Sequence, residues 1–395
     1  MHKNFLFISL LFALVVNSQQ PAKKEMQKLI DANLQLAVKQ YKYMQKLLPA
    51  GKLPRSYDSV KNELITSGTE WWCSGFYPGT LWFLYEYSQD EGLKAEALRS
   101  TALLEKEKNN KGTHDLGFML YCSYGNGYRL TKNNAYKDVM ITGARSLSTR
   151  FNPTIGCIKS WNSNSRWQFP VIVDNMMNLE FLCEMTKLGG DSSFYKIAVT
   201  HANTTIKNHY RSDFSSYHVI DYDTITGKKI KGYTAQGAFD ESAWARGQSW
   251  GLYGFVMMYR ETKNQEYLSF AQNIANFLLQ HKNMPADKIP YWDYNATDIP
   301  NTYRDASAAA IMCSGLLELA KYSDETLKKQ YVETATMIIK TLSTSYLAAA
   351  NTNGGFVLKH SVGHLPAKSE VDVPLTYADY YFIEALMRYK AWYLK

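Results

Sequence analysis

The sequence predicts an all-α protein, an (α/α)6 toroid carrying short β-hairpin insertions. Six stretches look like helices that are apolar on nearly every face, and a helix of that kind is buried on both sides. Short polar connections lead from these stretches into amphipathic helices, and such self-similarity is typical of repeats built from helical hairpins. The six apolar stretches begin at Gly75, His114, Val173, Ala243, Arg304 and Thr376.

Closure of the six hairpins into a ring leaves no exposed ends, which accounts for one domain in a chain of 395 residues. We therefore expect a single toroid domain over residues 19–395. An open solenoid is the structural alternative, and it would need polar capping helices at both ends.

The first 18 residues are predicted to be a signal peptide. Met1, His2 and Lys3 precede an apolar run from Phe5 to Val16, and Val16 and Ser18 occupy the −3 and −1 positions of a cleavage site. The run is too short to span a bilayer stably, and no later stretch is both long and apolar enough to do so. The mature chain is expected to be exported into the periplasm, with no membrane association after the signal peptide is removed.

Composition excludes several classes of protein. The net charge of +8 is spread along the chain without a basic run, so nucleic-acid binding is not expected. The five cysteines form no CxxC pair, which argues against both a disulfide scaffold and a zinc site. Aromatic residues make up 14% of the chain, a share that suits stacking on sugars as well as a large core.

The remaining elements follow in chain order. Residues 26–48 have helical spacing of apolar residues and predict an amphipathic helix, whereas 49–67 are rich in turn residues and predict a loop. Alternating apolar residues around Thr226-Gly227 predict a hairpin over 218–235. A second extended piece is expected at 354–359, leading into a loop at 360–372. Long insertions of this kind tend to gather on the binding face.

Polar residues recur where the inner helices begin. In a toroid these helices are parallel, so their N-termini open on one rim, and we expect the residues there to surround one cavity. Aspartate is also a favoured N-cap, so each of them could simply bond orphan amides. The residues in question are Asp115, Asp174, Arg246, Asp305 and Asp379.

Two acids in an aromatic-walled cavity suit general acid catalysis. Repulsion between like charges and desolvation raise the apparent pKa of one member of such a pair. Paired acids flanking a sugar are how most glycosidases work. An arginine nearby supplies a fixed cation, so a glycoside that carries an acid group is the expected substrate.

Five motifs then indicate a family. SGFYPGTLW, HDLGF, a DNMMN helix start, ARGQSWGLYGF and SEVDVPLTYADYYFIEAL occur in this order over nearly the whole mature chain. Together they resemble the unsaturated glucuronyl hydrolases of glycoside hydrolase family 88. The resemblance implies an (α/α)6 barrel that acts on oligosaccharides freed by polysaccharide lyases, such as those from glycosaminoglycans. The enzyme would hydrate the C4=C5 double bond of the terminal uronic acid, with no metal, no cofactor and no covalent intermediate.

The resemblance also assigns roles to residues. Asp174 matches the general acid and base, and Asp115 matches the second essential aspartate. The substrate-contacting residues it implies are His218, Gln236, Arg246, Trp250 and one of the pair Trp71-Trp72, with Trp71 preferred.

The residues to which the resemblance assigns roles could also have simpler structural explanations. His218 could be an ordinary hairpin residue. Lys368 and Ser361, from the loop HSVGHLPAKSE, could contact a sulfate on the next sugar or merely face solvent. We expect the protein to work as a monomer or a homodimer.

Three other functions stay open at this point. An unsaturated rhamnogalacturonyl hydrolase of family 105 would share the barrel and the hydration chemistry. A non-catalytic, exported oligosaccharide-binding protein would need Arg246 and the tryptophans but not the paired aspartates. An inverting hydrolase of saturated sugars would need the acids but not the double bond.

Overall fold

The computed structural model describes the backbone of residues 4–395 and the side chains of residues 23–395. The predicted signal peptide, residues 1–18, therefore lies outside the part of the chain whose side chains are described. Within the described part, no helix is both long enough and apolar enough to cross a membrane.

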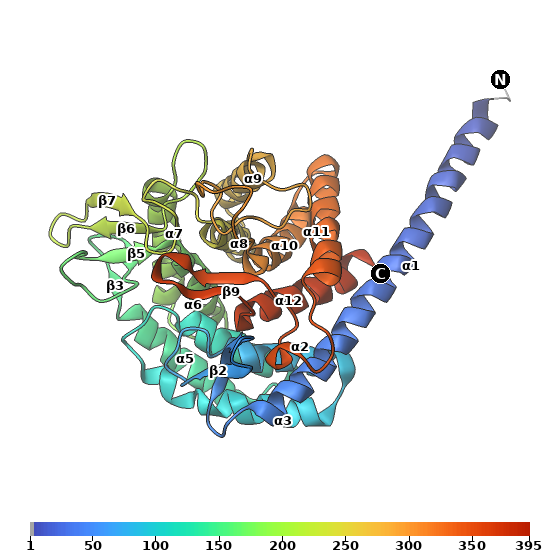
Figure 1. Ribbon diagram of the computed structural model, residues 1–395. Coiled ribbons are helices and arrows are strands. Elements are labelled where there is room, and N and C mark those ends of the chain that lie inside the picture. The colour runs from blue at the N-terminus through green and yellow to red at the C-terminus, as the bar shows by residue number, and fades with distance from the viewer. Residues whose placement is uncertain (1–3) are drawn as a thin grey trace.

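Helices in the described chain form two concentric sets, and Figure 1 shows them around a central axis. The inner set is α2 (Phe76–Ser88), η2 (Gly117–Gly125) with α4 (Asn126–Thr131), η3 (Val173–Asn178) with α6 (Leu179–Lys187), α8 (Ala245–Thr262), α10 (Ala306–Leu319) and α12 (Thr376–Tyr393). The outer set is α1 (Asn4–Leu47), α3 (Glu91–Leu103), α5 (Asn134–Ser148), α7 (Ser193–His209), α9 (Gln265–Gln280) and α11 (Glu325–Ser345).

The inner set closes on itself. Each inner helix contacts the next, and α12 returns to pack against α2. All fourteen residues of α10 are buried, as are the first fourteen of α8, because these helices have neighbours on both sides. The predicted toroid is thus confirmed.

Side-chain caps explain why the polar connections end where they do. Asp90, Asn133, Asn264 and Asp324 each accept a hydrogen bond from a backbone N–H in the first turn of the outer helix that follows. Such caps satisfy donors that have no partner inside the helix. The connections therefore start these four outer helices, α3, α5, α9 and α11, at a defined residue.

Strands occur only as small antiparallel insertions among residues 4–395. They are β1 (Leu53–Asp58) with β2 (Glu63–Ser67), β3 (Phe151–Asn152) with β4 (Cys157–Ile158), a sheet in the order β5 (Pro170–Ile172), β6 (Val219–Tyr222), β7 (Lys229–Tyr233), and β8 (Ser361–His364) with β9 (Ser369–Val373). The hairpin predicted over 218–235 is confirmed as β6 and β7, with β5 as an unexpected third strand.

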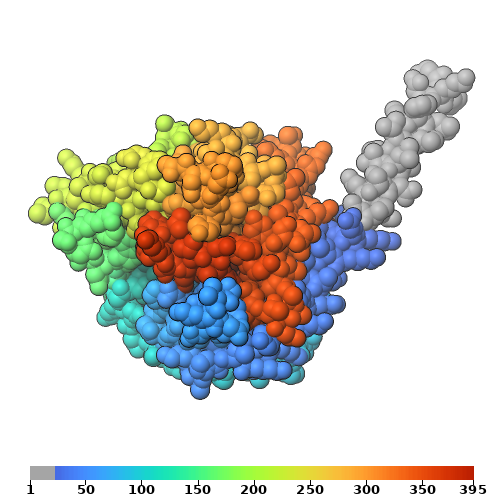
Figure 2. All heavy atoms as spheres, in the orientation of Figure 1, coloured from blue at the N-terminus to red at the C-terminus, as the bar shows by residue number. Residues whose placement is uncertain are grey.

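Two expectations about extended segments were wrong. Residues 49–67, expected to be a loop, contain the β1–β2 hairpin, whose Leu53 and Ser56 are buried. Residues 354–359 do not form a strand, because Gly354 and Gly355 have φ of 62° and 88° and turn the chain. The strand pair β8–β9 covers 361–373 instead, almost all of it in the stretch 360–372 where we expected a loop. Figure 2 shows this red hairpin beside the light-blue β1–β2 hairpin, which it contacts.

Candidate active site

The molecule has a cavity at each end of the inner ring. One has a volume of about 600 Å³ and is lined by residues from the C-terminal halves of the inner helices, including Glu86, Glu184 and Arg388. The other has a volume of about 240 Å³ and is lined by residues at or just before the N-termini of inner helices, including Asp115, Asp174 and Tyr377. The two cavities differ in whether the polar atoms around them have hydrogen-bond or ion-pair partners.

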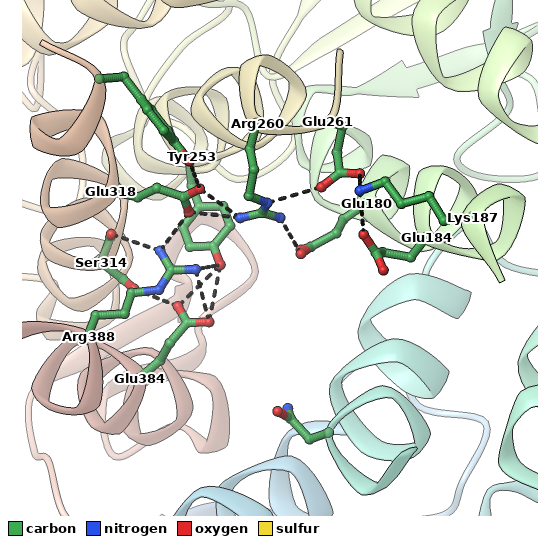
Figure 3. A network of polar contacts seen from close by, with 12 residues as sticks. Glu180, Glu184, Lys187, Tyr253, Arg260, Glu261, Ser314, Glu318, Glu384 and Arg388 are labelled. Carbon is green, nitrogen blue, oxygen red and sulfur yellow. Dashed lines mark hydrogen bonds and ion pairs between the residues drawn. The ribbon is translucent and has the colours of Figure 1, made fainter. Parts of the chain in front are cut away.

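The larger cavity is bordered by charged groups that bind one another. Arg260 donates to Glu180 and Glu318, while Arg388 pairs with Glu318 and Glu384 (Figure 3). A polar network whose members are satisfied rigidifies the structure rather than offering free groups to a ligand. The charged network at this end of the ring therefore stabilises the packing of the inner helices.

The smaller cavity is surrounded by buried polar atoms that have no hydrogen-bond partner among the described residues. Unpaired buried polar groups are costly, so several of them facing one hollow indicate a place that binds a polar ligand. Asp174 Oδ2, Arg246 Nε and Tyr377 Oη belong to lining residues, and His218 Nε2 and Trp250 Nε1 belong to residues beside Asp174. We take this cavity as the candidate active site.

Asp115 and Asp174 both line this cavity, as predicted from their positions before neighbouring inner helices. Thr113 Oγ1 donates to Asp115 Oδ2 at 2.8 Å, and His114 Nε2 lies 3.2 Å from Asp115 Oδ1. Asp174 sits in η3 with its side chain 11% exposed. The two acids therefore share one hollow but have different surroundings.

Burial raises the pKa of Asp174 to about 7, the negative charge of Asp115 adds to this rise, and the cation of Arg246 opposes it. A carboxyl group that titrates near neutral pH can donate a proton and later take one back. Asp174 is thus suited to be the general acid.

Arg246 lies at the start of α8 and is almost wholly buried. Its Nη1 donates to the carbonyl oxygen of Val362 and its Nη2 to that of Gly363 at 2.7 Å. Asp305 Oδ2 lies 3.5 Å from Nη1. The arginine therefore brings positive charge to the cavity wall and also anchors the β8–β9 hairpin over it.

Aromatic side chains form much of the remaining wall. Trp71, Trp72, Trp161 and Tyr377 line the cavity. The guanidinium of Arg55 lies 4.2 Å from the ring centroid of Trp71. Flat apolar faces next to charged groups are what a pyranose ring with a carboxylate requires.

The other predicted contacts fall into two groups. Gln236 lines the cavity. His218 and Trp250 are not lining residues but lie buried beside Asp174, and their ring nitrogens Nε2 and Nε1 have no hydrogen-bond partner among the described residues. Ser361 is fully buried in β8 and Lys368 is exposed after β8, and neither is among the lining residues. Their contact with a sulfate stays a prediction.

Asp305 and Asp379 do not ring the cavity, so that part of the prediction was wrong. Asp305 caps α10 by accepting from the backbone N–H of Ser307. Asp379 accepts from the backbone N–H groups of Val357 and Leu358, both at 2.9 Å. Asp305 thus acts as the N-cap that the alternative allowed. Asp379 lies inside α12 and does not cap it, because its carboxylate is bonded to amides of a distant segment.

Several lining residues were missed from the sequence. Tyr377 opens the last inner helix, and the rule that found Asp115 and Asp174 could have found it. Arg55 and Glu370 could not be found in this way, because they come from two hairpins. Arg55 Nε donates to Glu370 Oε1 at 2.5 Å and joins β1 to β9 in the lining of the cavity.

A ring of parallel inner helices that directs paired acids and aromatic side chains into one hollow defines a glycoside hydrolase of the (α/α)6 type. The profile of Glycosyl Hydrolase Family 88 matches residues 49–393, and the chain belongs to this family.

Similar proteins agree with this assignment. The chain is 46% identical over 342 residues to the unsaturated glucuronyl hydrolase of Formosa agariphila, covering 86% of this chain and 85% of that protein. It is 31% identical over 386 residues to the unsaturated chondroitin disaccharide hydrolase of Streptococcus agalactiae, covering 96% and 95%. The crystal structure of an unsaturated glucuronyl hydrolase specific for heparin matches with a TM-score of 0.89 and 46% identity, covering 92% of this chain and 97% of that one. The chain is accordingly a glycosidase of the unsaturated glucuronyl hydrolase kind.

Proposed function

We propose that this enzyme removes the 4,5-unsaturated uronic acid from the non-reducing end of glycosaminoglycan-type oligosaccharides produced by lyases. The reaction is a hydration of the C4=C5 double bond. A proton adds to C4 and a water oxygen adds to C5, which gives a hemiketal. The hemiketal then opens to a ketone and releases the rest of the oligosaccharide, so one water molecule is consumed.

In this proposal Asp174 supplies the proton to C4 and, as the resulting carboxylate, takes a proton from the water that attacks C5. The carboxyl group thus ends the cycle in its starting form. The observation that supports this role most strongly is the pKa of about 7 for Asp174 in a cavity that it shares with Asp115. An aspartate with an ordinary pKa would be fully ionised at neutral pH and could not act as the acid.

The cationic side of the cavity supports a uronic acid at this position. Arg246 lies on the wall with one unpaired N–H, and Trp71 offers a face on which a sugar can stack. The names of the two similar proteins and of the heparin-specific structure support an unsaturated uronyl residue from glycosaminoglycans as the substrate.

A panel of unsaturated disaccharides from heparin, chondroitin, hyaluronan and pectin tests the proposal. Hydration removes the alkene, so ultraviolet absorbance at the alkene band should fall for the glycosaminoglycan disaccharides. A fall only for the pectin product would indicate the rhamnogalacturonyl hydrolase instead. No fall with any disaccharide, together with unchanged binding by Asp174→Asn, would indicate a sugar-binding protein.

Export to the periplasm is a second part of the proposal, and the apolar run at residues 5–16 supports it. Expression of the full chain in a Gram-negative host should release a protein that begins at Gln19 into the periplasmic fraction. Mass spectrometry of that fraction measures the cleavage point, and an uncleaved chain in the cytoplasm would contradict the proposal.

A further inference from the structure

His218 lies directly before β6, in the wall behind the catalytic aspartate. Its side chain is fully buried, and the ring packs against Trp244, with ring centroids 4.5 Å apart, and against Trp161 at 5.9 Å. Its Nε2 atom faces Asp174 Oδ2 at 3.8 Å. The histidine is therefore held in one orientation toward the proposed acid.

The other ring nitrogen of His218 determines where the proton sits. Nδ1 accepts hydrogen bonds from the backbone N–H of Ala235 at 3.1 Å and from that of Gln236 at 3.2 Å. A backbone N–H can only donate, so Nδ1 carries no proton. The neutral ring therefore has its proton on Nε2, and that N–H points toward Asp174.

The loop that supplies these two amides is itself anchored on both sides. Thr234 N donates to Asp240 Oδ1 at 2.9 Å, and Thr234 O accepts from Arg166 Nη2 at 3.0 Å. His364 Nε2 bonds the carbonyl oxygen of Ala235 at 2.8 Å. Because the loop is tied at these points, its amides stay aimed at His218.

His218 Nε2 and Asp174 Oδ2 are each buried and without a hydrogen-bond partner among the described residues. At 3.8 Å they are too far apart to bond one another directly. A single oxygen atom about 2.8 Å from each of them would satisfy both.

The charges around His218 oppose its protonation. Burial lowers its pKa well below the usual value, and the cation of Arg246 lowers it further. Protonation would also break the two backbone hydrogen bonds to Nδ1. The titratable and charged groups that face the ring from the elements around it are Asp174, Arg246, His364, His209 and His114.

We propose that His218 is a tautomer-locked hydrogen-bond donor that holds the attacking water between its Nε2–H and Asp174 Oδ2. This inference rests on the proposed hydration reaction. The neutral ring cannot accept the proton of that water, because the lone pair of Nδ1 already accepts hydrogen bonds from two backbone amides and Nε2 carries a proton. The proton therefore goes to the carboxylate of Asp174 while the oxygen bonds to C5.

Nuclear magnetic resonance of the resting enzyme tests the lock without any reliance on activity. With ¹⁵N-labelled histidine, the His218 ring should show the neutral Nε2–H form throughout the range from about pH 5 to 8, in which an ordinary histidine titrates. The signals of His218 are assigned by comparison with the His218→Asn variant, in which they are absent. A proton on Nδ1, or a titration within that range, would overturn the proposal.

Two substitutions test the donor in catalysis. The amide nitrogen of His218→Gln reaches the position of Nε2, whereas His218→Asn keeps only an acceptor near Nδ1. We expect kcat within about tenfold of wild type for His218→Gln, and a loss of roughly 10²- to 10³-fold for His218→Asn, as for removal of one oriented donor. Equal losses in the two variants, or disappearance of one limb of the pH profile in His218→Gln, would contradict the role.

His201 provides a matched control. Its Nδ1 also accepts a backbone hydrogen bond, from Ile158 at 3.0 Å, and its Nε2 is likewise buried and unpaired among the described residues. Unlike His218, which lies 3.8 Å from Asp174, it is influenced by His209 and His114 and by no carboxylate in that part of the chain. His201→Asn should keep wild-type kcat in the fraction that folds. If wild type shows no hydration activity, the substrate proposal fails, while the NMR result still decides the tautomer.

Discussion

The raised pKa of Asp174 should make the active site a source of instability that depends on pH. Folding shifts the pKa of this carboxyl from 3.8 to about 7, because burial disfavours its charged form. A group with a raised pKa in the folded state contributes its full stability below the unfolded pKa and loses that contribution as pH rises through the folded pKa. The side chain of the Asp174→Asn variant cannot ionise, so this part of the fall in unfolding free energy with rising pH should be absent from the variant.

The size of the effect follows from the shift. About three pKa units at roughly 1.4 kcal/mol each correspond to about 4 kcal/mol between the ionised and neutral forms. Asp174→Asn should therefore gain on wild type progressively as pH rises from about 4 to 8, with a difference approaching roughly 4 kcal/mol in the free energy of unfolding. The same variant should lose several orders of magnitude in kcat.

Denaturant unfolding of both proteins at a series of pH values provides the assay. Other buried acids with raised pKa values, such as Asp379 and Glu180, are present in both proteins and cancel in the difference. A difference that stays constant with pH would show that the pKa of Asp174 is not raised by folding. The reasoning about its role as the acid would then be refuted.

Three further predictions follow from the contacts. Asp115→Asn should move the basic limb of the pH profile of kcat/KM to lower pH, because loss of the Asp115 charge lowers the pKa of Asp174; an unmoved limb would contradict the coupling. Asp379→Ala should cost about 2–6 kcal/mol in unfolding free energy, since it leaves two buried amides unpaired, and Asp379→Asn should cost less; equal melting temperatures for wild type and Asp379→Ala would refute this. Lys368→Ala should lower kcat/KM for sulfated disaccharides more than for unsulfated ones, and equal changes would exclude a sulfate contact.

The architecture could be predicted because it depends on local pattern. An inner helix must be apolar all round, and four of the outer helices begin at a polar cap such as Asp90 or Asn133, so both types are visible in short windows of sequence. Parallel inner helices then place their N-terminal residues on one rim. That geometric rule was enough to bring Asp115 and Asp174 to the same cavity.

The parts that could not be predicted depend on contacts between distant segments. Arg55 and Glu370 are 315 positions apart and meet only because two hairpins pack side by side. Asp379 follows the rule for rim residues, yet its carboxylate bonds amides of the segment that precedes β8. Nothing in the neighbourhood of Asp379 in the sequence distinguishes it from Asp174, because its partners lie about twenty residues earlier in the chain.

The attachment of the β8–β9 hairpin has a consequence for how the family could diversify. Arg246 grips the hairpin through the carbonyl oxygens of Val362 and Gly363, groups that every amino acid possesses. Exchange of side chains along the hairpin, other than at Gly363, where a Cβ would meet Glu370, therefore leaves those two hydrogen bonds intact. Natural variation or laboratory grafting can thus change the side chains that β8 and β9 present at the cavity while Arg246 keeps its place in the wall.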